Sequence, residues 1–132
     1  MMYGILYNTE MSKCLLIADD DAMFIDILRL EFEKHDLPWE VLTVTDGERT
    51  LRLVEERSPH LLLLDLRMPK VDGFAVLEAL KQKQSPLPVV VITNYHDDAH
   101  KRRSAEYGVR NYIVKSEWRL GQIVAEIGRH LA

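Results

Sequence analysis

The chain of 132 residues has the length of one domain, enough to bury a core without disulfides or a structural metal. Its formal net charge of −4 and pI of about 5.7 argue against a general nucleic-acid coat and against a polybasic membrane tether. The single cysteine, Cys14, excludes an intramolecular disulfide and multi-cysteine metal sites. Its apolar neighbours favour a buried, unreactive thiol.

The N-terminal segment has neither the apolar length of a membrane span nor the basic start and apolar core of a secretory signal. We therefore expect a cytoplasmic protein without membrane contact. Residues 1–12 are interpreted as an extension, with Met11 as an alternative start, and residues 13–132 as the domain.

Five short apolar runs predict five β-strands. They are continuous rather than alternating, which is typical of strands buried on both faces of a parallel sheet. The runs are 14–18, 41–44, 61–64, 89–92 and 112–114.

The segments between and after these runs predict helices. Phe24, Ile27, Leu28 and Phe32 follow a helical period, and residues 120–131 give the clearest such pattern. Weaker patterns begin at residues 51 and 74, and a polar stretch covers 97–107. Strand and helix thus alternate five times. This order predicts an α/β, (βα)5 doubly wound five-stranded parallel sheet with helices on both faces.

Charged and hydroxyl side chains follow four of the five predicted strands. Open parallel sheets place their sites at the carboxyl ends of the strands, so these side chains should gather at one edge. Asp19, Asp20 and Asp21 follow the first run, Asp65 the third, Thr93 and Asn94 the fourth, and Lys115 and Ser116 the fifth.

Clustered carboxylates repel one another unless a cation neutralises them. Carboxylate oxygens with water and backbone carbonyls suit Mg²⁺, and Lys115 adds a second cation. Such a site attracts a phosphoryl group, and a central carboxylate can itself accept that group.

Four ordered motifs resemble bacterial response-regulator receiver domains. Residues 15–21 resemble the first strand and acidic pair of that family, and 64–73 (LDLRMPKVDG) the phosphorylation loop. Residues 91–93 match the strand that ends in the switch hydroxyl, and 111–115 the switch aromatic and lysine. The resemblance covers about residues 13–131, and it implies the strand order 2-1-3-4-5.

The resemblance also implies a role for each polar residue at the sheet edge. Asp65 would be the phospho-acceptor, and Mg²⁺ would be held by Asp19, Asp20, Asp65 and the backbone carbonyl of Arg67. Two further residues, Thr93 and Lys115, would hold the phosphoryl oxygens. Tyr112 would rotate inward when Thr93 moves toward the phosphate.

The expected function is that of a stand-alone signalling switch of the chemotaxis-regulator type, not an enzyme. A histidine kinase or histidine phosphotransfer protein would phosphorylate it. Its output would be a partner protein bound to the face of the fourth helix, fifth strand and fifth helix, without direct nucleic-acid contact. It would be a monomer or a phosphorylation-dependent dimer. The alternative is an isolated receiver from a longer DNA-binding or enzymatic regulator.

Several local features depart from the family pattern or add to it. Ser116 stands where the family has proline, so we expect a trans peptide before it and a cap on the last helix. Asp21 should cap the first helix. Arg67 and Tyr95 flank the expected approach of water to the acceptor, with Asn94 adding bulk nearby. We therefore expect slow loss of the phosphoryl group.

Other interpretations are weaker. An aspartate-dependent phosphohydrolase needs an acid where Arg67 stands, and a flavodoxin-like carrier needs a phosphate loop where three aspartates stand. His96 and His100 have metal-ligand spacing but no third ligand, so we interpret them as exposed. The basic run 101–103 is interpreted as a solvated helix face, and Trp118 as a packing residue on the last helix.

Overall fold

The computed structural model describes residues 12–132, in which five strands alternate with five helices. The strands are β1 (Lys13–Ala18), β2 (Trp39–Val44), β3 (Leu61–Leu64), β4 (Val89–Thr93) and β5 (Asn111–Val114). The helices are α2 (Ala22–Lys34), α3 (Gly47–Arg57), α4 (Gly73–Gln82), α5 (Asp98–Ala105) and α6 (Leu120–Leu131).

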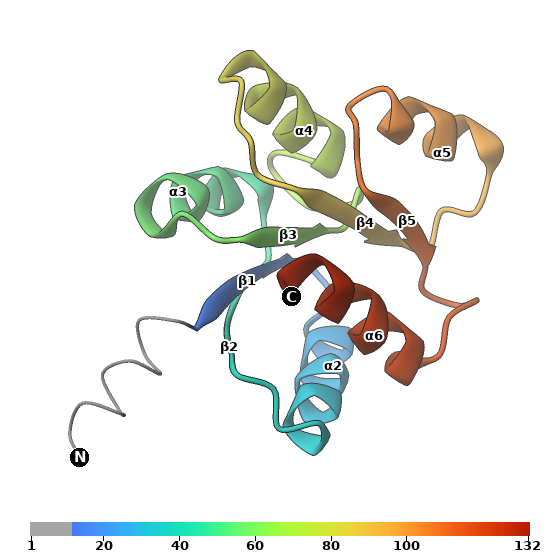
Figure 1. The fold of residues 1–132 in the computed structure, drawn as a ribbon. Helices are drawn as coiled ribbons and strands as arrows, with labels where there is room; N and C mark the ends of the chain where they lie inside the picture. Colours follow the sequence, from blue (N-terminus) through green and yellow to red (C-terminus); the bar gives the residue numbers. More distant parts are fainter. Residues whose placement is uncertain (1–11) are drawn as a thin grey trace.

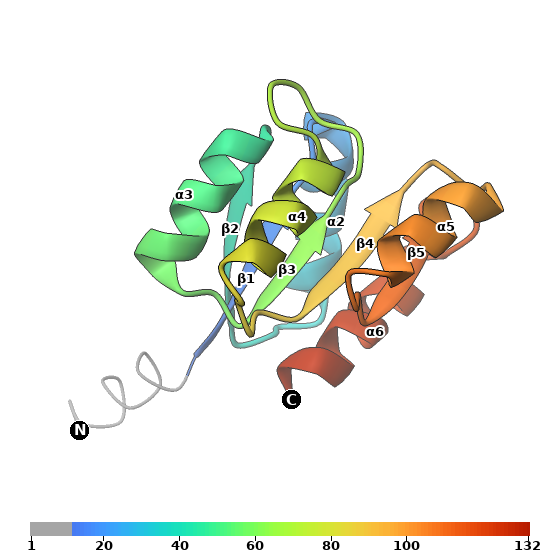
Figure 2. The same ribbon diagram turned by 90° about the horizontal axis from the view of Figure 1, so that it is seen from above.

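The strands form one parallel sheet in the order β2-β1-β3-β4-β5. Helices α2 and α6 cover one face of this sheet, and α3, α4 and α5 cover the other (Figure 1). Figure 2 shows α3, α4 and α5 side by side in front of the strands. The predicted fold class and strand order are confirmed.

Each central strand contributes to two cores because its side chains alternate between the faces of the sheet. Leu15 and Ile17 pack with α2 and α6, whereas Leu16 and Ala18 pack with the helices of the other face. All four side chains are fully buried, and Cys14 is buried as predicted. The sheet is therefore a rigid support for the loops at its carboxyl edge.

Four helices begin at an aspartate whose side chain accepts a backbone hydrogen bond from the first helical turn. Asp21 accepts from Phe24 in α2, which confirms its predicted role as a cap. Asp46, Asp72 and Asp97 cap α3, α4 and α5 in the same way. These caps satisfy otherwise free N–H groups and fix where each helix starts.

Helix α2 has a different buried stripe from the predicted one. Ile25, Leu28 and Phe32 are buried, whereas Ile27 is exposed and Phe24 is only partly buried. The predicted stripe was therefore wrong at Ile27. Ile25, which is buried in place of Ile27, also has helical spacing to Leu28 and Phe32, so the hydrophobic pattern alone did not decide between the two.

The last helix, α6, covers the predicted pattern 120–131, but the predicted cap was wrong. It starts at Leu120, so Ser116 does not cap it, and Trp118 lies in the preceding turn rather than on the helix. The N–H of Glu117 donates to the carbonyl of Val114 at 3.0 Å, which forms a separate turn. No cis peptide occurs in the described part of the chain, so the peptide before Ser116 is trans as expected.

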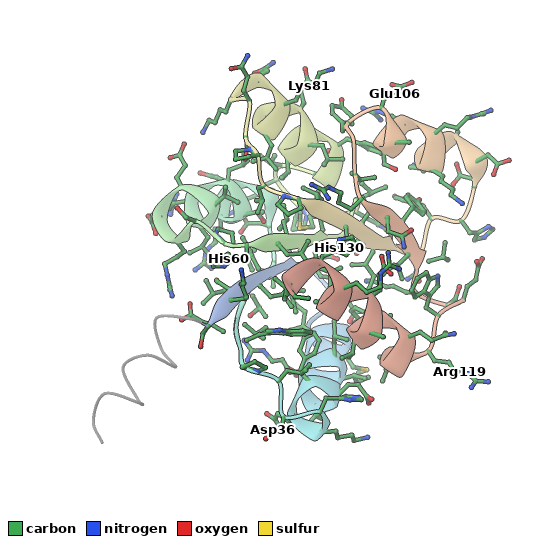
Figure 3. The ribbon with its side chains drawn as sticks, in the orientation of Figure 1. Asp36, His60, Lys81, Glu106, Arg119 and His130 are labelled. Carbon is green, nitrogen blue, oxygen red and sulfur yellow. The ribbon has the colours of Figure 1, made fainter. Side chains whose placement is uncertain are left out.

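At the edge of the sheet where the strands begin, a histidine side chain forms a hydrogen bond with the backbone of β1. His60 lies beside the start of β1 (Figure 3), where its Nδ1 accepts from the Cys14 N–H at 3.0 Å.

The predicted extension, residues 1–12, lies outside the described residues except for Ser12. Among the helices of residues 12–132, none has the length and apolarity to cross a membrane.

Candidate functional site

Two aspartates stand side by side where β1 and β3 end. The N–H of Asp19 donates to the Val44 carbonyl at 3.0 Å, and the N–H of Asp65 donates to the Ala18 carbonyl at 2.8 Å. These bonds extend the pairing of the strands beyond their last residues. The side chains of Asp19 and Asp65 are 0% and 6% exposed.

Lys115 places its ammonium between these two carboxylates. Its Nζ lies 2.7 Å from Asp19 Oδ2 and 3.1 Å from Asp65 Oδ2, and the side chain is only 8% exposed. The ammonium also lies 4.5 Å from the centre of the Phe24 ring, close enough for a cation–π interaction. No sequence pattern predicted this contact, since Phe24 looked like an ordinary residue of a helix core.

The other oxygen of each carboxylate is oriented by the backbone. Asp19 Oδ1 accepts from the N–H of Asp21 at 2.9 Å, and Asp65 Oδ1 accepts from the N–H of Arg67 at 3.0 Å. Each carboxylate is therefore held between a backbone N–H and the ammonium. Such second contacts fix the direction in which a reactive group points.

The charges at this edge are unbalanced. Burial, together with the charge of Asp65, raises the pKa of Asp19 to about 6 despite its contact with Lys115. Burial opposes the charge of the Lys115 ammonium, but the two carboxylates outweigh it and raise its pKa. One cation thus neutralises two buried carboxylates incompletely, and a further cation would be favourable here.

Asp20 completes a set of acids that fits a divalent metal. One carboxylate oxygen from each of Asp19, Asp20 and Asp65 lies within 4.8 Å of the others. Asp20 is exposed, so the set is open to solvent on that side. Three oxygen ligands with room for water suit Mg²⁺. Such an ion would offset the burial and the Asp65 charge that raise the pKa of Asp19.

A cleft of about 220 Å³ opens over the acids. It is wide enough for a phosphoryl group and its metal. Both residues expected to tune access, Arg67 and Tyr95, are at its wall. The lining residues are Asp20, Asp21, Asp65, Arg67, Thr93, Asn94, Tyr95 and Lys115.

The two predicted switch residues, Thr93 and Tyr112, both form a hydrogen bond with the backbone of Tyr95. Thr93 is buried, and its Oγ1 accepts from the N–H of Tyr95 at 3.3 Å. The hydroxyl of Tyr112 donates to the carbonyl of Tyr95 at 2.6 Å. Tyr112 is therefore in the inward position, and burial followed by the charges of Asp97 and Asp65 raises its pKa to about 12.

Two glycines allow the loop after Asp65 to fold against the helices. A Cβ on Gly73 would lie 2.4 Å from the backbone oxygen of Asp65, and a Cβ on Gly47 would lie 1.9 Å from that of Val71. Gly73 belongs to the phosphorylation-loop motif, but Gly47 was missed. Its only signal is its place in the Asp46-Gly47 pair after the second strand.

The interpretation of His100 as simply exposed was wrong. Its ring stacks on Tyr95 with 4.1 Å between centroids, and its Nδ1 lies 2.7 Å from Asp97 Oδ2. His96 is exposed as expected. The basic residues 101–103 are exposed too, although the guanidinium of Arg103 also lies 3.9 Å from the centre of the Phe74 ring.

A doubly wound parallel sheet with acids, a lysine and a hydroxyl at its carboxyl edge is the architecture of α/β domains that carry their site at the ends of the strands. The family model for the response regulator receiver domain matches residues 15–127. The chain belongs to this family.

Known relatives support the assignment. Alkaline phosphatase synthesis transcriptional regulatory protein PhoP of Bacillus subtilis is 30% identical over 105 residues, covering 80% of this chain and 43% of PhoP. The probable transcriptional regulator ycf27 of Galdieria sulphuraria is 34% identical over 108 residues, covering 82% of this chain and 41% of that protein. The chain thus spans less than half the length of these relatives.

A solved structure has the same fold. The signal receiver domain of a LuxO-type repressor from Vibrio parahaemolyticus aligns with a TM-score of 0.84. The alignment covers 91% of this chain and 90% of that domain, with 20% sequence identity. The likeness supports the fold alone.

Proposed function

We propose that this receiver domain is a signalling switch that is phosphorylated on Asp65 with Mg²⁺ as its cofactor. The observation that carries the proposal is the position of Asp65, which contacts Lys115 and lines the cleft beside two other acids. An Asp65 oxygen forms a bond to phosphorus as the donor's phosphorus–nitrogen bond breaks. Bound Mg²⁺ would supply positive charge beside the phosphoryl oxygens, which the Lys115 ammonium would also contact, and the leaving imidazole of the donor would take up a proton from solvent.

The test is phosphorylation by a small phosphodonor in the presence of Mg²⁺, followed by intact mass and mapping of the modified residue. We expect one phosphoryl group on Asp65, lost on chelation of the metal before the reaction. Asp65→Asn should abolish it. Asp72→Asn is the matched control, because Asp72 lies in the same loop and asparagine also caps helices. Equal labelling of the Asp65 variant would refute the assignment.

The proposed donor is a histidine kinase or a histidine phosphotransfer protein, docked beside α2. Met23, Ile27 and Leu30 form an exposed apolar stripe on this helix, at 72%, 41% and 58% exposure. The helix begins at Ala22, directly after the cleft residues Asp20 and Asp21, so a partner on the stripe lies close to the cleft. Ile27→Ser with Leu30→Ser should slow transfer from a protein donor and leave a small donor unaffected. Equal slowing with both donors would contradict docking.

We propose that Arg67 and Tyr95 lengthen the life of the phosphorylated form. Both line the cleft, and neither carries a carboxylate or an amide that would orient an attacking water. Arg67→Asn with Tyr95→Glu should therefore speed phosphate loss. Unchanged loss in this double variant would exclude steric shielding by these side chains. The backbone carbonyl of Arg67 remains a proposed metal ligand.

The proposed output is binding of a protein to the face of α5, β5 and α6, in the cytoplasm, without enzymatic turnover. Phosphorylation would change this face through Thr93 and Tyr112. A second candidate is the receiver part of a longer DNA-binding regulator, favoured by the coverage of 43% of PhoP and 41% of ycf27. The reading frame beyond Ala132 distinguishes the two: a following DNA-binding region would favour the second.

A further inference from the structure

An aromatic stack joins Tyr95, in the loop between β4 and α5, to His100 in helix α5, which does not line the cleft. His100, from the first turn of α5, lies flat against Tyr95, with 4.1 Å between ring centroids and 17° between the planes. His100 also stacks near Phe74 of α4, with 5.9 Å between the two ring centroids and 28° between the ring planes. This arrangement connects the wall of the cleft with two helices.

Asp97 fixes the orientation of the histidine ring. His100 Nδ1 lies 2.8 Å and 2.7 Å from the two oxygens of the Asp97 carboxylate, and the His100 N–H donates to Oδ2 at 3.1 Å. Asp97 is itself the N-cap of α5. The ring is therefore anchored to the start of the helix, and Tyr95 stacks on a fixed surface.

Tyr95 has three contacts that matter to the proposed switch. Tyr95 lines the cleft with Asp65, its N–H donates to Thr93, and its carbonyl accepts from Tyr112. A side chain that holds Tyr95 thus acts both on water access to Asp65 and on the position of Tyr112. Within this stack, His100 is the residue that Asp97 anchors.

We propose that His100 is a positioning residue that couples the lifetime of phosphorylated Asp65 to the inward position of Tyr112 by holding Tyr95. The inference rests on the proposed phosphorylation of Asp65. His100 does not contact the reacting atoms and acts only through Tyr95. Loss of the stack should free the Tyr95 ring, admit water to the cleft and loosen the carbonyl that accepts from Tyr112.

The test compares His100→Ala, His100→Phe and Tyr95→Ala, with Lys101→Ala as a control on the exposed side of α5. After removal of the donor, His100→Ala should lose phosphate between about twofold and tenfold faster than the parent, the range for one aromatic contact. Phenylalanine should restore most of the lifetime because it keeps the stack. The double variant Tyr95→Ala with His100→Ala should lose phosphate no faster than Tyr95→Ala alone, since His100 acts only through Tyr95.

A second measurement does not require phosphorylation. The NMR signals of the Tyr112 ring should shift in His100→Ala and remain near the parent in His100→Phe and Lys101→Ala. Unchanged Tyr112 signals, an additive double variant or a phenylalanine variant as fast as alanine would each overturn the inference. Absence of label from Asp65 in the parent would instead refute the proposed function, with the Tyr112 signals still deciding the contact.

Discussion

Two clusters around buried carboxylates, one at the carboxyl edge of the sheet and one between β5 and α6, differ in how fully their acids are compensated. The edge cluster consists of Asp19, Asp65 and Lys115, with two acids for one cation. The α6 cluster is built around one acid, Glu126. Its oxygens lie 2.8–3.0 Å from three partners on β5 and α6: Asn111, Arg129 and His130.

The pKa of the acid shows the difference. Burial raises the pKa of Asp19 to about 6 in the edge cluster. In the α6 cluster burial acts in the same direction on Glu126, but hydrogen bonds from Asn111 and His130 and the charge of Arg129 outweigh it and lower its pKa. A balanced cluster only stabilises the fold. An unbalanced one keeps part of its electrostatic cost, which a ligand can relieve.

The largest expected effect comes from removing the single cation of the edge cluster. Lys115→Met leaves two buried carboxylates without a cation, and we expect it to lower the free energy of unfolding by about 3 kcal/mol. Chemical denaturation at pH 7 without Mg²⁺ measures this value. Lys83→Met is the control, because Lys83 pairs with Glu55 on the exposed surface, where water weakens the interaction, and its loss should be much smaller. Equal losses would mean that burial at the edge has no special cost.

The α6 cluster should respond less. Glu126→Gln keeps the shape of the side chain but removes its charge, so we expect a loss of about 2 kcal/mol of unfolding free energy from weakened charge-assisted hydrogen bonds. Phosphorylation of Asp65 should continue in this variant. A stability gain would show that the cluster is not balanced as its contacts indicate.

The sequence predicted the fold and the acids of the edge cluster because both depend on local signals. Continuous apolar runs mark buried strands, and the residue after each run lies at the sheet edge once the topology is known. Asp65 and Lys115 are 50 residues apart in the sequence. They lie close together because each directly follows a strand of the same parallel sheet.

Contacts that depend on side-chain packing between distant elements were not predictable in this way. Phe24 beneath the Lys115 ammonium, Gly47 against Val71, and the Tyr95–His100 stack have no periodic signal. The exposure of Ile27 reflects how helix α2 is rotated against the sheet, which the hydrophobic pattern alone did not decide.

Replacing Asp19 should stabilise the protein. Asp19→Asn removes one of two like charges beside Lys115, and we expect a gain of about 1 kcal/mol at pH 7 without Mg²⁺. The pKa of Asp19 rises from 3.8 in the unfolded chain to about 6 in the folded protein. Its proton therefore stabilises the folded state below pH 3.8, and this contribution is lost as the pH rises through 6.

The gain from Asp19→Asn should accordingly be present at pH 7 and nearly absent at pH 4. Denaturation of parent and variant at both pH values provides the measurement. Glu126→Gln should show the opposite pH dependence, because the lowered pKa of Glu126 stabilises the fold at high pH and this is lost on acidification. A gain from Asp19→Asn that persists at pH 4 would exclude charge repulsion as its cause.

The smallest expected effect is the response of the two clusters to Mg²⁺. An ion that binds only the folded edge cluster and Asp20 stabilises the protein by about 0.4 kcal/mol at a concentration equal to its dissociation constant, and by more at higher concentrations. Thermal unfolding across a Mg²⁺ series measures this shift.

Asp20→Asn should remove the stabilisation by Mg²⁺, because Asp20 is the exposed acid of the metal set. Glu126→Gln should retain it, since the α6 cluster offers no uncompensated carboxylate. Asp26, an exposed acid on α2 outside the metal set, provides the matched control as Asp26→Asn. If Mg²⁺ raises the melting temperature of Asp20→Asn as much as that of Asp26→Asn, the ion acts on general surface charge rather than at the sheet edge.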